Sequence, residues 1–230
     1  MNIAVLCAME REYSLFIERM KERSALDEDV VTGTIEDCAD KLIVARSGIG
    51  KVNAALAANR IISKYGVGCV ISVGVAGGID KSLKVGDIVI GNSYCYHDVW
   101  CGEPNKEGQV QGLPAFFPSC FGIWMEKIGT MDVKLGTIAT GDWFIQTAYH
   151  VSKNLGWLPK EYNIMAVDME SAAIAQVCYI SNIPFMSIRA ISDIPVDPYI
   201  QNAADHKEKY EAFWDSEAGK SFDVIANILK

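Results

Sequence analysis

Histidine is scarce in this chain, basic residues are outnumbered by acidic ones, and long hydrophobic runs are missing. The 230 residues include three histidines, and 21 Lys and Arg stand against 29 Asp and Glu, for a net charge of −8. This charge disfavours a nucleic-acid binder, which would carry a basic patch, and disfavours binding to an anionic membrane surface. No apolar run reaches the roughly 18 residues of a membrane span. An anionic small substrate remains possible, because a site can be locally positive.

The cysteines and histidines do not form a metal-binding pattern. None of the seven cysteines is spaced as CxxC, and the histidines form no cluster with cysteine or carboxylate, so a zinc signature is missing. The odd number of cysteines, several of them in apolar runs, is typical of buried reduced thiols. The chain also does not open on a basic stretch followed by a long apolar run. We therefore expect a cytoplasmic enzyme or binding protein.

Strand-like and helical patterns alternate along the chain. Runs typical of strands lie at 2–8, 28–36, 41–46, 68–74, 85–90, 133–139 and 185–191. Helical patterns lie at 13–20, 52–65, 148–158, 171–180 and 203–229, the last as one closing amphipathic helix. No linker or repeat interrupts this alternation. The sequence therefore predicts one α/β domain over residues 1–230.

Carboxylates follow the ends of several of these strands. Glu170 and Asp193 each close an apolar strand, at the place where open α/β sheets bind ligands. Buried charge there costs solvation free energy unless a partner compensates it. A turn or cap is the commoner role for a single acid, but the pair favours a site. Glu12, after the first strand, has two interpretations: an acid stabilised by the helix dipole, or a carboxylate at the mouth of the sheet.

Other strand ends carry small, aromatic or imidazole side chains. The turns at 47–51 and 75–78 are rich in glycine and allow backbone N–H groups to approach a ligand, although the P-loop spacing is absent. Trp143 and Phe144 either stack on a flat ring or pack in the core. His97 is either catalytic or, more commonly for such a position, a hydrogen-bonded structural residue.

A series of short segments resembles the 5′-methylthioadenosine/S-adenosylhomocysteine nucleosidase family of the nucleoside phosphorylase superfamily. In order they are AMERE (8–12), SGIGKVNAA (47–55), GVAGGI (74–79), KVGDIVI (84–90), YHDV (96–99), TGDWFI (140–145), AVDMESAAIAQVC (166–178) and IPFMSIRAISD (183–193). The resemblance implies a twisted mixed sheet, partly closed into a barrel and flanked by helices, usually in a homodimer. It also implies hydrolysis of the N-glycosidic bond between adenine and a 5′-thioribose, in methionine salvage, without metal or organic cofactor.

The same resemblance implies a role for each acid. Asp193 matches the general acid that protonates adenine N7, with Ser192 orienting it. Glu12 matches the carboxylate that activates the attacking water. Glu170 matches the residue that binds the ribose hydroxyls and stabilises the developing sugar cation, with Met169 alongside.

The resemblance also implies the rest of the pocket. Phe144 stacks on adenine, and the residues that contact the base edge or lie beside the base and ribose are Ile145, Val167, Ala76 and Gly77. Apolar residues line the 5′-thioalkyl pocket: Met9, Ile49, Val99 and Tyr210. The 105–118 loop, with Phe116, closes this pocket from a second subunit.

Some positions depart from the family pattern. Arg11 replaces an acid, Trp143 replaces a small residue, and the connection at 195–202 is longer than usual. These departures bear on which 5′-substituent is preferred more than on the reaction. The sequence does not rank methylthio, homocysteinyl, deoxy and futalosine-type nucleosides as substrates.

Two other functions remain open. Arg11 and Arg46 keep phosphorolysis as an alternative, because phosphorylases of the superfamily hold phosphate with arginines. Neither arginine lies in a phosphorylase-like motif, and Glu12 favours water. A non-catalytic nucleoside-binding protein is the third hypothesis, although the retention of all three acids argues against it.

Overall fold

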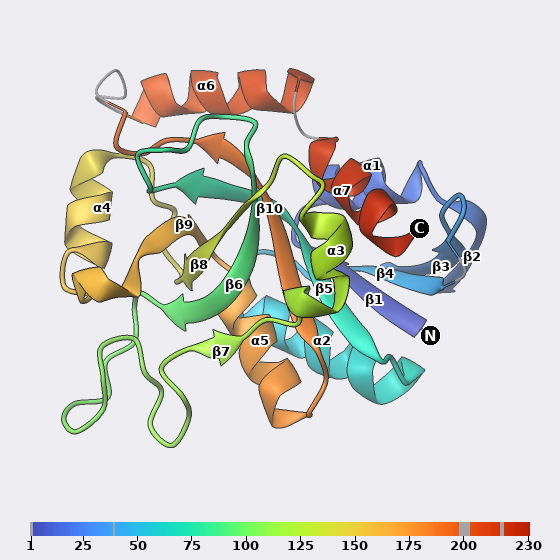
Figure 1. Ribbon diagram of the computed structural model, residues 1–230, viewed down its shortest axis with the longest axis horizontal. Helices are drawn as coiled ribbons and strands as arrows, with labels where there is room; N and C mark the ends of the chain where they lie inside the picture. Colours follow the sequence, from blue (N-terminus) through green and yellow to red (C-terminus); the bar gives the residue numbers. More distant parts are fainter. Residues whose placement is uncertain (1, 39, 198–202, 217–218) are drawn as a thin grey trace.

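A mixed ten-stranded sheet forms the centre of the computed structural model, which describes residues 2–38, 40–197, 203–216 and 219–230 (Figure 1). The strands are β1 (Asn2–Cys7), β2 (Lys21–Asp27), β3 (Val30–Thr34), β4 (Lys41–Arg46), β5 (Cys69–Gly78), β6 (Ile88–Tyr96), β7 (Phe117–Pro118), β8 (Lys134–Thr140), β9 (Ile164–Asp168) and β10 (Phe185–Asp193). The helices are α1 (Glu10–Ile17), α2 (Lys51–Tyr65), α3 (Met125–Ile128), α4 (Ala148–Leu155), α5 (Ser171–Ile180), α6 (Ala203–Ser216) and α7 (Lys220–Leu229), with 3₁₀ turns at Phe121–Trp124 and Lys160–Tyr162.

Five strands of this sheet close into a barrel. β5 pairs with β10, β10 with β6, β6 with β8, β8 with β9, and β9 again with β5. The first part of β5, Cys69–Val73, also pairs with β1, from which the sheet continues through β4, β3 and β2. The predicted α/β fold with a partly closed sheet is confirmed.

Hydrophobic clusters lie on both faces of the sheet, which explains its continuous apolar strands. Every residue of β10 is buried, as expected of a strand covered on both faces. One cluster packs α2 and the alanine-rich α5 against the sheet, and another packs α1 and α7 against its other side. In Figure 1, α6 crosses one end of the barrel, while α7 lies beside α1 and α3. None of the helices described here has the length and apolar character needed to cross a bilayer.

The closure brings several strand ends together. β1, β5 and β10 are parallel neighbours, so their carboxyl ends lie at one edge. β9 runs antiparallel to β5, but the two pair only near their last residues, with Gly77 opposite Val167. Thr140 at the end of β8 lies opposite Asp168 at the end of β9. Residues far apart in sequence therefore meet at one end of the barrel.

The predicted helix over 203–229 is wrong, because α6 and α7 are separate helices. α7 begins at Lys220 after Gly219, where an added Cβ would lie 2.8 Å from Nη2 of Arg19. The apolar side chains of α7 pack into the hydrophobic cluster that also contains α1 residues. The predicted long connection at 195–202 lies partly outside the described residues, as do residues 217–218.

Strand β2 was not predicted from the sequence. All of its residues are exposed, so it shows no alternation of apolar and polar side chains. Its pairing with β3 at the sheet margin forms the strand instead.

Candidate active site

A cavity of about 380 Å³ opens at the end of the barrel where these strand ends meet. All of the predicted site residues except one line it: Met9, Glu12, Ile49, Ala76, Gly77, Phe144, Ile145, Val167, Met169, Glu170, Ser192, Asp193 and Tyr210. Ala8, Val75, Trp143 and Asp168 also line it. Val99 is placed elsewhere, partly buried against the hydrophobic cluster of α2 and α5. The Val99 carbonyl accepts a hydrogen bond from the Gly108 N–H.

Glu12 is fixed by backbone donors from two elements. Its Oε2 accepts from the N–H groups of Ala8 and Met9, each at 2.9 Å, and its Oε1 accepts from the Val75 N–H at 3.1 Å. The first two bonds satisfy donors at the start of α1, as in a capping box. Burial raises the pKa of Glu12, while these N–H groups and the charge of Arg189 act in the opposite direction.

Asp193, the last residue of β10, is held at both carboxyl oxygens. Ser192 Oγ donates to Oδ1 at 2.7 Å, and Nε2 of His206 lies 2.9 Å from Oδ2. Only 2% of Asp193 is exposed, so these contacts replace water. Ser192 thus contacts Asp193 directly. His206 lies in the polar helix α6, and no pattern in the sequence singled it out.

Glu170, the residue directly before α5, is hydrogen-bonded to the glycine-rich turn that precedes α2. Its Oε1 accepts from the Gly50 N–H at 2.9 Å. Gly50 has φ +92°, a conformation that favours glycine, so the turn can present its N–H to the acid. Burial, reinforced by the charge of Asp168, raises the pKa of Glu170 to about 8.

Asp168 and Arg189 form a buried ion pair beneath the cavity. Arg189 Nε donates to Asp168 Oδ2 at 2.9 Å, and Nη2 donates to Ser72 Oγ at 2.9 Å. Asp168 also accepts from Thr140 Oγ1 at 2.6 Å and from Ser171 Oγ. Neither member of the ion pair was predicted as a site residue. An arginine inside an apolar strand is nevertheless a usable signal, because a buried charge requires a partner.

A polar cluster anchors the aromatic segment at 140–145. Lys51 Nζ contacts both carboxyl oxygens of Asp98 at 2.7 Å, and Asp98 accepts from the Asp142 N–H at 2.9 Å. The Lys51 N–H in turn donates to Asp142 Oδ1 at 2.8 Å. These bonds hold the start of α2 against the segment that carries Phe144.

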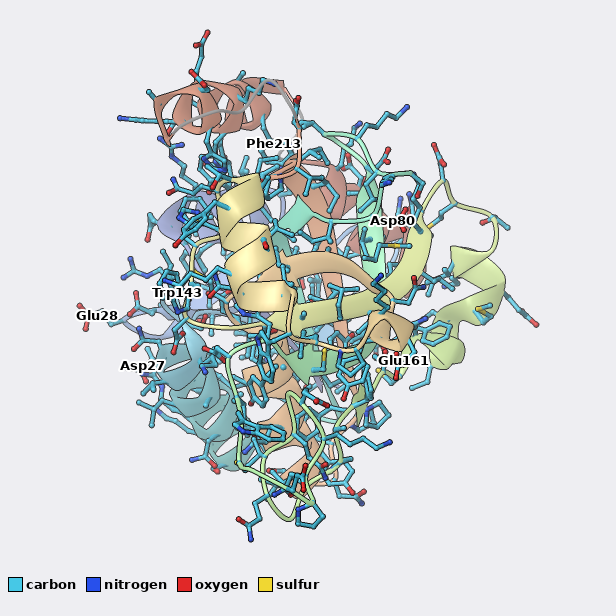
Figure 2. The ribbon with its side chains drawn as sticks, turned by 90° about the vertical axis from the view of Figure 1, so that its left-hand side faces the viewer. Asp27, Glu28, Asp80, Trp143, Glu161 and Phe213 are labelled. Carbon is cyan, nitrogen blue, oxygen red and sulfur yellow. The ribbon has the colours of Figure 1, made fainter. Side chains whose placement is uncertain are left out.

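The aromatic side chains of this segment point in different directions. Phe144 lies edge-on to the rings of His206 and Tyr210, with centroids 5.2 and 6.0 Å apart. Trp143 lies at the surface beside α4, where Lys153 Nζ is 4.5 Å from its ring centroid (Figure 2). Half of Phe144 is exposed, so one side of its ring is available to a ligand.

The two arginines considered for phosphate binding are engaged by carboxylates. Arg11 Nη1 lies 2.8 Å from Glu211, and Arg46 bonds Asp29 at 2.6 Å and Glu10 at 2.9 Å. Neither arginine lines the cavity. Their charges are therefore directed to surface partners.

His97 is buried and lies outside the described cavity lining. The residue is 1% exposed, burial lowers its pKa, and its ring packs so close to Gly141 that a Cβ there would overlap it. Among the described residues, neither ring nitrogen of His97 has a hydrogen-bond partner, so His97 is a packed side chain and not the hydrogen-bonded structural residue expected. Its place outside the cavity lining also argues against a catalytic role. In the part of the chain that the structure describes, no group of three or more His, Cys, Asp or Glu residues is arranged to hold a metal ion.

The fold and the acids at its strand ends define a class of proteins, the phosphorylase superfamily, whose family model matches residues 2–230. A nucleosidase for 5′-methylthioadenosine and S-adenosylhomocysteine from Bacillus pumilus is 36% identical over 247 residues, covering 100% of this chain and 99% of the relative. The enzyme of that name from Bacillus subtilis is 37% identical over 223 residues, covering 90% and 94%. The crystal structure of the Neisseria meningitidis nucleosidase with methylthio-immucillin-A has a TM-score of 0.85 and 34% identity, covering 100% of this chain and 98% of that one.

The chain belongs to the 5′-methylthioadenosine/S-adenosylhomocysteine nucleosidase family.

Proposed function

We propose that this chain hydrolyses the N-glycosidic bond of 5′-thioadenosines of the methylthioadenosine/S-adenosylhomocysteine type, releasing adenine and the thioribose. The observation that carries the proposal is the convergence of three buried acids on one cavity: Glu12, Glu170 and Asp193. Each acid comes from a different element and has a different set of partners. Such separate environments suit different roles in one reaction.

Asp193 protonates N7 of adenine and so makes the base a better leaving group. Its partners at both oxygens fix the rotation of the carboxyl, as proton transfer requires. Phe144 stacks on the base, and Ile145 and Val167 contact its edge. Ala76 and Gly77 lie beside base and ribose, where the absence of bulk leaves room for the nucleoside.

Glu12 positions and activates the attacking water. A carboxylate has about four lone-pair sites, and three backbone N–H groups occupy part of that capacity. The remaining capacity can accept a proton from water. Burial raises the pKa of Glu12, which increases its strength as a base.

Glu170 binds the ribose hydroxyls, alongside Met169. In its ionised form, its carboxylate stabilises the cation that develops on the sugar as the bond breaks. The Gly50 N–H leaves Oε2 of Glu170 available to the sugar. The apolar side chains of Met9, Ile49 and Tyr210 surround the 5′-thioalkyl group, and the Tyr210 hydroxyl already approaches Met9 Sδ at 3.8 Å.

The surface partners of Arg11 and Arg46 favour water over phosphate as nucleophile. A phosphorylase needs cations directed into its cavity to hold the phosphate. Both arginines instead bond carboxylates outside the cavity lining. Hydrolysis is accordingly the proposed reaction.

The chain acts as a homodimer, with the 105–118 loop near the partner's site. Val52 and Leu56 lie one turn apart on α2 and are 68% and 64% exposed, a patch that a second subunit would cover. Phe116 packs on Tyr162 of its own chain, with ring centroids 4.6 Å apart, so the loop is anchored internally. Sedimentation analysis would show twice the 25.2 kDa chain mass.

All seven cysteines are free, in keeping with a cytoplasmic location that cell fractionation can check.

Adenine release from methylthioadenosine at neutral pH tests the proposal. We expect turnover by the wild type and a loss of roughly 10²–10⁴-fold in Glu12→Gln and Asp193→Asn, as is typical when an acid or base is removed. Full activity of both variants would refute the assigned roles. Tight binding without turnover by the wild type would instead identify a nucleoside-binding protein. A panel with methylthio, homocysteinyl and 5′-deoxy substituents then ranks the substrates.

A further inference from the structure

His206 contacts the acid that protonates the base, although it does not line the described cavity. Its Nε2 lies 2.9 Å from Asp193 Oδ2, and 1% of the residue is exposed. Ser192 occupies the other oxygen, Oδ1. Rotation of the Asp193 carboxyl about its Cβ–Cγ bond would break both contacts. His206 therefore approaches Asp193 from behind the cavity wall and restricts its rotation.

The His206 ring is itself held in place by two aromatic neighbours. Tyr210, one turn further along α6, stacks on it at 6.0 Å with an interplanar angle of 17°. Phe144, the proposed platform for adenine, meets it edge-on at 5.2 Å. The position of Nε2 is thus set by the same side chains that form the wall of the cavity.

We propose that His206 is a positioning residue that holds the Asp193 carboxyl in register with the base and stabilises the carboxylate that forms during the reaction. This inference rests on the proposed function. In that reaction the Asp193 proton passes to N7, the glycosidic bond breaks with its electron pair going to adenine, and Asp193 is left as a carboxylate. In the tautomer that carries its proton on Nε2, this N–H donates to Oδ2, and the bond strengthens as negative charge develops there. The contact therefore stabilises the transition state more than the ground state and contributes mainly to kcat.

Three substitutions separate this role from simple packing. His206→Phe keeps an aromatic ring between Tyr210 and Phe144 but removes the donor. His206→Gln places an amide nitrogen the same number of bonds from the backbone as Nε2. His206→Asn carries the same amide with a shorter reach, which makes it the matched control for His206→Gln. Lys207→Ala, at the exposed neighbouring position, controls for any change in α6.

Steady-state adenine release from methylthioadenosine gives the test, with thermal unfolding of each variant alongside. We expect His206→Phe and His206→Asn to lower kcat by roughly 10–100-fold, the range for a hydrogen bond to a charged group. KM should change by less than about threefold, because ground-state binding is retained. His206→Gln should restore kcat to within about fivefold of wild type, and Lys207→Ala should match the wild type.

The outcomes distinguish this inference from the proposed function. If the wild type releases no adenine, the proposed function fails. If the wild type is active and His206→Phe keeps its kcat, only the role of His206 is overturned. Equal losses in the Gln and Asn variants would also overturn it, since reach would then be irrelevant. If His206→Phe does not fold, the comparison of Gln with Asn still decides the question.

Discussion

Arg189 places a buried positive charge among the acids of the site. It is fully enclosed and pairs with Asp168, and its charge lowers the pKa of both Glu12 and Glu170 against the larger effect of burial. Removing one partner of such a buried pair leaves an uncompensated charge and destabilises the fold. At the scale of single residues, the site thus depends on a cation that does not line the cavity.

Glu170 makes the stability of the empty protein depend on pH. Burial raises its pKa to about 8 in the folded chain, against about 4.3 in an unfolded one. Between these values the folded state holds a proton that the unfolded state has lost, so this residue lowers stability as the pH rises through that window. Above about pH 8 its contribution is constant.

Glu170→Gln removes this titration while keeping an acceptor for the Gly50 N–H. We predict that the melting temperature of the variant exceeds that of the wild type most at pH 9, and that the difference shrinks toward pH 5. Unfolding curves of both proteins without ligand, over this pH range, measure the difference directly. A difference that is constant with pH, or largest at pH 5, would contradict the assignment.

At the scale of elements, strand β5 makes room for the Glu12 carboxylate because Gly74 has no side chain. A Cβ on Gly74 would lie 2.5 Å from Oε1 and 3.0 Å from Cδ of Glu12. The next residue, Val75, donates its N–H to the same oxygen. The strand therefore both provides space for the carboxylate and fixes it.

Gly74→Ala should displace Glu12 and lower kcat by about 10²-fold, the cost of misplacing a reacting group by about 1 Å. In a Glu12→Gln background the same change should cost little more, because the two substitutions affect one function. Gly122→Ala, where a Cβ meets nothing within 4 Å, is the matched control and should keep its activity. Additive losses in the double variant would show that Gly74 acts through something other than Glu12.

Elements with a clear hydrophobic pattern could be predicted from the sequence, and the others could not. The buried strands β5 and β10 followed from continuous apolar runs. The exposed strand β2 depends on its pairing with β3 and shows no periodic pattern, and the separation of α6 from α7 is marked in the sequence by Gly219 alone. The same limit applies to His206, whose partner lies on another element.

At the scale of the whole molecule, the alternation of strands and helices predicted the α/β class, but not the closure of the sheet. The pairing of β10 with both β5 and β6 is a long-range contact, and it reached the prediction only through the family resemblance. The resemblance also named 13 of the residues that line the cavity. Val99 is the exception. The resemblance assigned it to the 5′-thioalkyl pocket, but similarity of a short segment does not fix where the chain turns after β6.

We propose that water, not phosphate, attacks the sugar while Asp193 protonates the base. The most direct measurement is phosphorus NMR of a methylthioadenosine reaction in phosphate buffer, with adenine release followed in parallel without phosphate. We predict an unchanged inorganic phosphate signal, free thioribose as the sugar product, and equal rates of adenine release in both buffers. A sugar 1-phosphate signal together with no release in the phosphate-free buffer would contradict the account.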